Sequence, residues 1–410
     1  MESLEKLPNN LKQWLLDFVH TQGVPEDWLP IVSCVLTITP ILLVFPLLFA
    51  LTTVFERKGL ARIQNRYGPN RVGIPWTNIR LFGFGQFAAD GIKSLTKEDV
   101  VPDAADKKLH FLAPVVLAVP IVLTFSVIPF GKYLVPIEIE AGLLFFFAVG
   151  GMAELAIFMA GWSSRNKYSL LGAMRAIAQM ISYEVPLILG AVVVVMASGT
   201  LNPVSIAAQQ QSDVWLGFAT WNVFSPWGLL AFILFFIAML AEANRSPFDL
   251  PEGESELVAG YFTEYSGFKF ALFFMAEYLG LFAAMGMCIT LFLGGWGSPF
   301  NFAPFNLVPS YLWFMGKLVF GIFFIIWIRG TMPRIRMDQL MNFAWKFMLP
   351  LGLLNILVVG FLHSGQDTPV PIRMLQWVFA ACVLVIAWYL LGDRLAGGKV
   401  PKPRKYRFAE

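Results

Sequence analysis

Long apolar runs recur along the chain, and short polar segments separate them. A helix needs roughly 20 residues to cross the hydrocarbon core of a bilayer, so runs of this length are candidate spans. We count nine, with cores at residues 29–54, 109–128, 141–162, 171–197, 227–243, 268–293, 311–328, 345–362 and 375–391. The pattern predicts an all-α polytopic membrane protein of about nine transmembrane helices.

The segment before the first run has a helical periodicity of its own. Its apolar side chains fall on one helical face, at Leu11, Trp14, Leu15, Phe18 and Val19. This favours a short helix that lies on the outer membrane surface. An extension of the first span explains the same pattern equally well.

A second amphipathic pattern lies in the polar segment after the first span. Residues 79–95 mix apolar side chains with Gln86, Asp90 and Lys93. We predict an amphipathic helix in this first cytoplasmic loop, where it can border a lateral opening toward lipid.

The distribution of Lys and Arg predicts the orientation of the chain. The loops after spans one, three, five and seven, together with the tail, hold 25 of the 30 basic residues. The opposite face has only Lys6, Lys12, Lys132 and Arg373, and Lys317 lies within the seventh run. Because short cytoplasmic loops collect basic residues, we expect the N-terminus outside and the C-terminus in the cytoplasm.

These features divide the chain into three parts. We predict an outer-face segment at 1–28, an integral membrane domain at 29–393 and a cytoplasmic basic tail at 394–410. The tail has five basic residues and two prolines between positions 399 and 407. It suits anionic lipid headgroups or an acidic partner, and a solvated tail without a partner is the simpler alternative.

The composition agrees with a lipid environment. The 410 residues are 57% hydrophobic and 14% charged, whereas soluble domains have about a quarter charged residues. The three Cys are far apart in apolar runs, and the three His lie at the ends of such runs. We therefore expect no disulfide framework, no metal site and no redox centre in this chain.

Four acidic residues, Glu154, Glu184, Glu242 and Glu277, lie within or at the edge of predicted spans. An ionised carboxylate at such a depth is costly unless it meets water or a partner. Such residues are candidates for function, although a hydrogen bond to a neighbouring helix is the structural alternative. Pro186 follows Glu184 by two residues, and we expect a bend there that admits water.

The fifth span ends in a segment that proline keeps from continuing as a regular helix. Pro247 and Pro251 are four residues apart. Seven acids occupy residues 242–277, at Glu242, Asp249, Glu252, Glu254, Glu256, Glu264 and Glu277. Carboxylates so close together exchange protons readily, which favours a proton path. The acids at 252–256 alone also fit the exposed start of a helix.

Three segments carry a resemblance to one family. They are ERKGLARIQNRYGPNRVG at 56–73, GAMRAIAQMISYEVP at 172–186, and residues 240–277. Through them the chain resembles the H subunit of bacterial NADH:quinone oxidoreductase, respiratory complex I, whose mitochondrial counterpart is NADH dehydrogenase subunit 1. The resemblance extends from about residue 28 to residue 391.

The resemblance implies a membrane subunit that forms much of a quinone chamber beneath a peripheral arm. The iron–sulfur clusters and FMN are expected in partner subunits, and quinone is the substrate. The implied chamber residues are Arg57, Arg66, Asp90, Arg245, Phe248, Glu254, Glu256 and Arg329. The implied proton path toward adjacent membrane subunits consists of Glu154, Glu184, Glu242, Asp249, Glu252 and Glu277.

Three other functions compete with this one. The first is the equivalent subunit of a membrane-bound hydrogenase or formate-linked complex, which binds no quinone. A stand-alone cation-coupled transporter would use the same buried acids, and a passive anchor would use its charges only to satisfy one another. On the quinone hypothesis the chain lies in a bacterial inner membrane, beside redox subunits.

Overall fold

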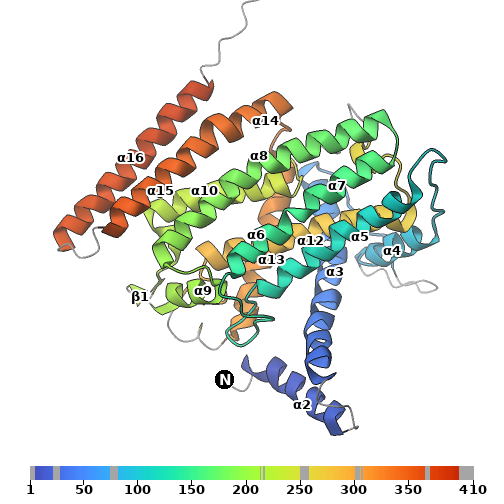
Figure 1. Cartoon of the computed structure of the whole chain (residues 1–410), viewed down its shortest axis with the longest axis horizontal. Helices are drawn as coiled ribbons and strands as arrows, with labels where there is room; N and C mark the ends of the chain where they lie inside the picture. Colours follow the sequence, from blue (N-terminus) through green and yellow to red (C-terminus); the bar gives the residue numbers. More distant parts are fainter. Residues whose placement is uncertain are drawn as a thin grey trace, which may run out of the picture.

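The fold is described by a computed structural model that covers residues 5–21, 28–73, 82–212, 214–215, 218–249, 258–300, 305, 308–364 and 370–396. Most of these residues lie in helices, which pack into one bundle and are joined by turns and loops (Figure 1). The described strands are a small antiparallel pair, β1 (Val214–Trp215) and β2 (Phe218–Ala219), in which Val214 lies opposite Ala219.

Within the described ranges, seven helical segments are long and apolar enough to cross a membrane, and two shorter apolar helices accompany them. The seven are α3 (Leu29–Ile63), α5 (Lys107–Thr124) with η2 (Phe125–Val127), α6 (Gly142–Gly150) with α7 (Met152–Ser163), α8 (Lys167–Ser198), α12 (Gly267–Phe292), α13 (Ser310–Thr331), and α14 (Met337–Phe343) leading through η6 (Ala344–Met348) into α15 (Leu349–Ser364). The shorter two are α10 (Pro226–Glu242) and the apolar part of α16 (Val370–Ala396). Each predicted span has its counterpart, so the predicted fold class is confirmed.

The helices depart from the prediction in their details. The third span is divided between α6 and α7 at Gly151, and the eighth begins at Met337 and contains the π-helical turn η6. Two consecutive glycines weaken a helix, which explains the first departure. The helix α8 stays unbroken through Pro186, so the proline does not end it.

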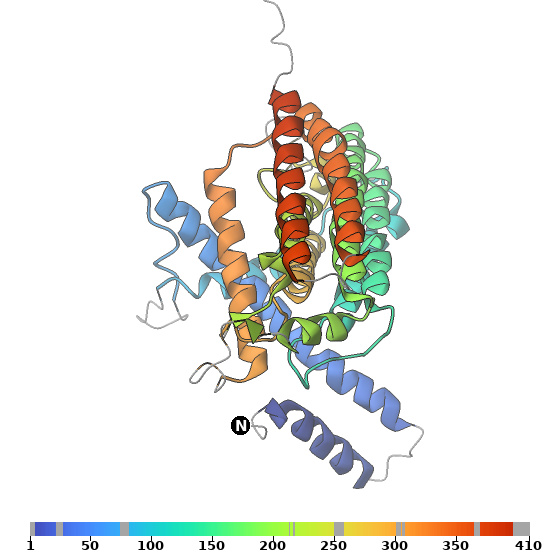
Figure 2. The same ribbon diagram turned by 90° about the vertical axis from the view of Figure 1, so that its left-hand side faces the viewer.

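The central and peripheral helices differ in burial. Of the 18 residues that form the apolar stretch of α12, 67% are buried inside the protein, whereas only 6% of the corresponding stretch of α3 are buried. The helix α12 contacts α5, α10 and α13, and α8 contacts α7, α10 and α15. Figures 1 and 2 show α3 projecting at one side of the bundle and the pair α15–α16 at another.

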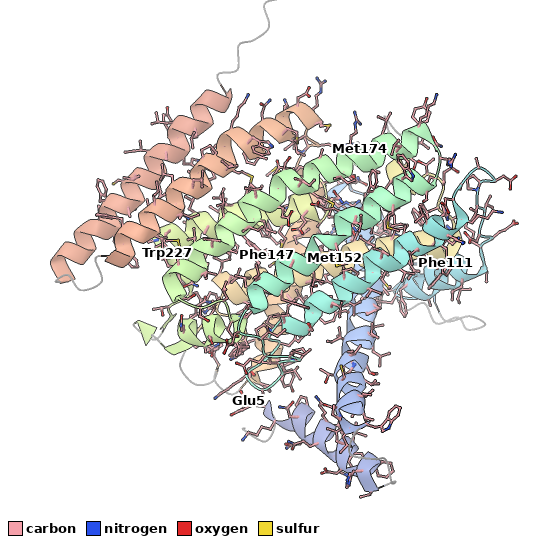
Figure 3. The ribbon with its side chains drawn as sticks, in the orientation of Figure 1. Glu5, Phe111, Phe147, Met152, Met174 and Trp227 are labelled. Atoms are coloured by element: carbon pink, nitrogen blue, oxygen red, sulfur yellow. The ribbon has the colours of Figure 1, made fainter. Side chains whose placement is uncertain are left out.

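Large apolar side chains cover the outside of the bundle. Phe111, Met152 and Met174, which are labelled in Figure 3, are 63%, 46% and 52% exposed. An exposed apolar surface of this kind is expected where lipid tails, rather than water, surround the protein.

The two predicted amphipathic helices are present with different bounds. The first, α2 (Leu7–Thr21), is a separate helix that turns back along α3, so it is not an extension of the first span (Figure 2). The second, α4 (Gln86–Thr96), is shorter than predicted, and residues 74–81 lie outside the described part. The α4 side chains Ile92 and Leu95 are 60% and 68% exposed, as suits a helix beside lipid.

The intramembrane Lys317 finds its partners at the end of α12. Its Nζ donates to the carbonyl oxygens of Leu293, Gly295 and Gly297 at 2.6, 2.9 and 2.7 Å. It also lies 4.3 Å from the ring centroid of Trp221, which precedes η3 (Asn222–Phe224) and follows α9 (Pro203–Ser212). A positive charge favours the carboxyl end of a helix, so Lys317 fixes this end of α12.

Candidate functional site

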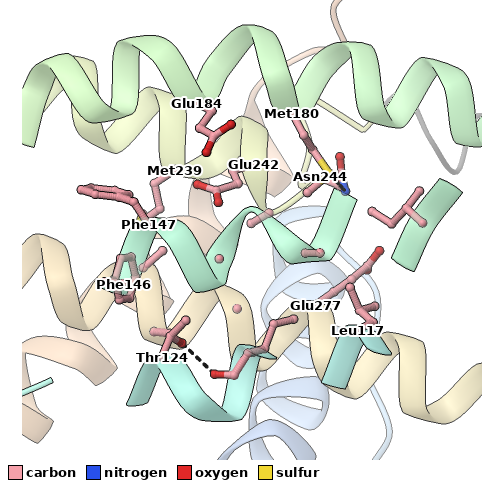
Figure 4. A pocket seen from close by; sticks show the side chains of 18 residues that line it. Leu117, Thr124, Phe146, Phe147, Met180, Glu184, Met239, Glu242, Asn244 and Glu277 are labelled. Carbon is pink, nitrogen blue, oxygen red and sulfur yellow. Dashed lines mark hydrogen bonds between the residues drawn. The ribbon is translucent and has the colours of Figure 1, made fainter. Parts of the chain in front are cut away.

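A cavity inside the bundle gathers three of the predicted acids. Glu184 of α8, Glu242 at the end of α10 and Glu277 of α12 line it together with apolar side chains such as Phe146 and Met239 (Figure 4). Its volume of about 70 Å³ can hold several waters, since about 10–15 Å³ suffices for one. The cavity therefore combines carboxylates with room for the water that would connect them.

A fourth predicted acid, Glu154, lies close to this cavity but not among the described residues that line it, just after the break between α6 and α7. Gly150 lines the cavity, and a Cβ added to Gly151 would lie 3.4 Å from Oε1 of Glu184. Glu154 follows one turn later, and both Glu154 and Glu242 lie within electrostatic range of Glu184. Glu154, Glu184 and Glu242 thus influence one another electrostatically, and Glu184 and Glu242 share the cavity.

Glu277 leads from the cavity to a buried arginine. Its Oε1 accepts a 2.6 Å hydrogen bond from the Tyr261 hydroxyl, and its Oε2 lies 3.7 Å from Nη2 of Arg245. The Glu277 and Arg245 side chains are only 8% and 4% exposed. Tyr261 lies in η4 (Gly260–Phe262), which packs so closely on α8 that a Cβ on Gly172 would lie 2.6 Å from the Cα of Gly260.

The contacts continue from Arg245 toward the ends of α3 and α13. The Arg245 guanidinium lies 3.9 Å from the ring centroid of Tyr278, a cation–π geometry. The Tyr278 hydroxyl donates to Glu56, and Glu56 is paired with Arg329. A chain of charged and aromatic groups therefore joins Glu277 to the ends of α3 and α13.

Three members of this chain, Glu56, Tyr261 and Tyr278, are absent from the residue set predicted from the sequence. Glu56 stands in the motif 56–73, next to Arg57, but its partner Tyr278 is 222 residues away. The pattern of charges along the sequence gives no signal for so distant a contact.

Gln179 holds the segment that follows α10. Its side chain is fully buried, and its Nε2 donates to the carbonyl oxygens of Ala241 and Phe248, both at 2.7 Å. Phe248, predicted to line the chamber, is 5% exposed and packs on Tyr183 with ring centroids 5.5 Å apart. The side chain from α8 thus gives this proline-containing segment its shape.

We expect Gln179→Leu to lower quinone reductase activity and the thermal stability of the assembled complex. The buried carbonyl of Phe248 would lose its Gln179 donor, at a cost of about 1–3 kcal/mol, whereas the Ala241 carbonyl keeps the backbone N–H of Asn244. Arg245 lies between Ala241 and Phe248 in sequence, so its position would also change. Activity assays and thermal melts of the purified complex measure both effects. Gln209→Leu is the control, because Gln209 is exposed and donates at 3.3 Å to Ser198 from the surface of α9. Equal melting temperatures and activities for the two variants would contradict this role of Gln179.

The other predicted chamber residues near the first loop form a separate pair. Nη1 of Arg57, on α3, lies 2.8 Å from Oδ2 of Asp90, on α4, and the side chains are 51% and 35% exposed. Arg66 follows the end of α3, is exposed, and donates to Gln64 at 2.8 Å. The Arg57–Asp90 pair thus ties the amphipathic helix to the first span.

The remaining predicted acids have different positions. Glu252, Glu254 and Glu256 lie outside the described residues. Asp249 follows Phe248 and is partly buried. It does not belong to the described residues that line the acidic cavity. Glu264 accepts a 2.6 Å hydrogen bond from Asn166, which caps α8, and this explains it as a structural residue.

The described residues contain no group of three or more His, Cys, Asp or Glu that could hold a metal ion. The chemistry that their arrangement supports is proton transfer among carboxylates and electrostatic response to charge near Glu56, Arg245 and Arg329.

Most of the chain is similar to one known family. The model of the NADH dehydrogenase family matches residues 36–360, which include the residues that line the acidic cavity and the residues that connect Glu277 to Glu56 and Arg329. The H subunit of the NADH-quinone oxidoreductase of Geobacillus kaustophilus (strain HTA426) is 47% identical over 309 residues, 75% of this chain and 87% of the relative. The protein of the same name from Dehalococcoides mccartyi (strain CBDB1) is 43% identical over 349 residues, 84% of this chain and 91% of the relative.

Proposed function

Because the chain belongs to the NADH dehydrogenase family, with H subunits of NADH-quinone oxidoreductases as its relatives, we propose that it forms the quinone chamber of such a complex and couples quinone reduction to proton translocation. The observation that carries this proposal is that Glu184, Glu242 and Glu277 line one cavity, and that contacts lead from Glu277 through Arg245 and Tyr278 to Glu56. It gives a physical route between a site at the cytoplasmic end and carboxylates inside the membrane.

The chamber is proposed at the cytoplasmic ends of α3 and α13. The residues that line or border it are Arg57, Arg66, Asp90, Arg245, Phe248 and Arg329. Glu254 and Glu256, which lie outside the described residues, belong to the same proposed set. Basic side chains there stabilise the negative charge that quinone gains on reduction, without any covalent step. Quinone takes up two electrons and two protons to become quinol, and the electrons come from an iron–sulfur cluster of a partner subunit.

The proton path is proposed to run along Glu154, Glu184, Glu242 and Glu277, with Asp249 and Glu252 at its chamber end. A change of charge beside Arg245 alters the field on Glu277, because the two side chains are nearly free of solvent screening. Neighbouring carboxylates then redistribute their protons through the water that the cavity can hold. Energy thus passes electrostatically toward the adjacent membrane subunits.

The setting of the chain follows from the same proposal. The basic loops and the tail at 394–410 face the cytoplasm, beneath the peripheral redox subunits, and the segment 1–28 lies on the outer face of a bacterial inner membrane. The chain adds no redox centre of its own, and FMN and iron–sulfur clusters belong to the partner subunits.

The test is to purify the complex through a tag on this chain and label it with a photoreactive quinone. We expect hydrophilic redox subunits to copurify, and the label to fall on peptides near Arg57, Asp90 and Arg329. Excess unlabelled quinone should suppress the labelling. Purification of the chain alone would favour the transporter, and a redox complex without quinone labelling would favour the hydrogenase-like subunit.

A further inference from the structure

A second, larger cavity lies far along α3 from the proposed chamber, between α2, α3 and the segment that follows η2. Its volume is about 260 Å³, and its walls are mostly apolar, with Leu36, Pro40 and Val44 of α3 opposite Phe130. The polar groups of its lining include Lys12 and Asn9 of α2 and Thr37 of α3. The cavity is therefore an apolar slot with a cationic group on one wall.

Three of the four basic residues on this side of the protein gather around the slot. Nζ of Lys12 donates to Oγ1 of Thr37 at 2.8 Å. Nζ of Lys6 and of Lys132 lie 5.2 and 5.5 Å from the ring centroid of Tyr133, whose carbonyl accepts a 2.8 Å bond from Asn9. Positive charge is thus concentrated at one point of a face that has little of it elsewhere.

The described acids of the same segments do not line the slot. Glu5 and Asp17 belong to the same N-terminal segment, and Glu138 of the adjoining loop accepts a 3.2 Å bond from Asn202. None of these three acids lines the slot, among the residues that the structure describes there.

The opposite face of α2 is built for the membrane interface. Leu11, Trp14 and Phe18 are 54%, 61% and 51% exposed, and the rings of Trp14 and Phe18 stack with centroids 6.0 Å apart. Aromatic side chains prefer the level of lipid headgroups. With this face in lipid, Lys12 and the mouth of the slot lie at headgroup depth.

We propose that this slot binds one anionic phospholipid from the leaflet beside α2. The phosphate is recognised by Lys12, with Lys6 and Lys132 at the rim, and an acyl chain extends along Leu36, Pro40 and Val44. The negatively charged headgroup matches the lysine side chains, and the acyl chain matches the apolar wall of the slot. A quinone ring is neutral, so three ammonium groups would not be needed to bind it. The site is independent of the proposed quinone chemistry.

To test this, the intact complex is placed in phosphatidylcholine nanodiscs that contain a trace of photoreactive phosphatidylglycerol, or of the matching phosphatidylcholine probe. Peptide mapping then locates the label. We expect the anionic probe to label the lining of the slot about fivefold more than the neutral probe, and Lys12→Gln to remove about that factor. Lys93→Gln on α4 is the control for the same loss of charge at another membrane interface.

Equal labelling by the two probes would overturn the proposal, even if every Lys12 variant failed to assemble, because that comparison uses the unaltered protein. Cross-linking of the slot to a neighbouring subunit, without lipid label, would overturn it in favour of a protein occupant. Quinone labelling near Arg57 should be unchanged in Lys12→Gln, so failure here and failure of the proposed function are distinguishable.

Discussion

Glu242→Gln is expected to abolish most proton translocation by the assembled complex and to slow quinone reduction about 100-fold, the order by which a lost proton-transfer group lowers a rate. Glutamine has nearly the same shape and hydrogen-bonding capacity, but it cannot carry a proton. Glu242 shares the lining of one cavity with Glu184 and Glu277, so we expect its loss to interrupt proton transfer between them.

The measurement compares NADH-driven proton uptake and quinone reduction in vesicles that contain equal amounts of assembled complex. Glu184→Gln should behave alike, and the double variant should be no worse than either single one, since groups of one path act as a unit. Glu140→Gln is the control, because Glu140 is exposed and lies before α6. If Glu242→Gln kept the full rates of proton uptake and quinone reduction, as Glu140→Gln is expected to do, a role for Glu242 would be refuted.

Arg245→Met is expected to destabilise the complex strongly, and Glu277→Gln in the same chain should restore part of the loss. Removing one partner of a buried ion pair leaves an uncompensated charge, which costs about 3–5 kcal/mol. Arg245 and Glu277 are almost completely buried, and Arg245 also lies over the ring of Tyr278. Neutralising Glu277 removes the unpaired charge but not the lost cation–π contact, so the rescue should be partial.

Thermal melts of the purified complex and its quinone reductase activity distinguish stability from function. We expect the double variant Arg245→Met with Glu277→Gln to recover stability without recovering coupled activity. Arg57→Met is the comparison for stability, because its pair with Asp90 is half-exposed and such pairs contribute about 0–1 kcal/mol. If Arg245→Met melted at the same temperature as Arg57→Met, the buried pair would contribute no more to stability than the half-exposed one.

The sequence predicts the spans well because lipid imposes a simple rule on them. A run such as 268–293 must be helical wherever it crosses a bilayer, and α12 (Gly267–Phe292) matches it within a residue or two. The same rule makes an acid in such a run conspicuous, which explains why Glu184, Glu242 and Glu277 are recognisable before the fold is known.

The details that depend on packing could not be predicted in this way. The break at Gly151 places α6 and α7 against Glu184, and the partner of Glu56 lies on α12. Glu264 has the sequence context of the acidic path, yet it belongs to the cap of α8 through Asn166. Depth in the membrane can be read from composition, whereas partners are fixed only when helices are packed.

The three carbonyl bonds of Lys317 have a consequence for how force can travel through the protein. They clamp the carboxyl end of α12 to α13, and near its middle the same helix holds Glu277 and Tyr278 against Arg245. A helix held at these two points is restrained from sliding along its axis to relieve a new charge. On the proposed function, α12 therefore transmits rotamer changes, proton shifts and rearranged water around a stationary backbone, and the helix is the frame in which these movements occur.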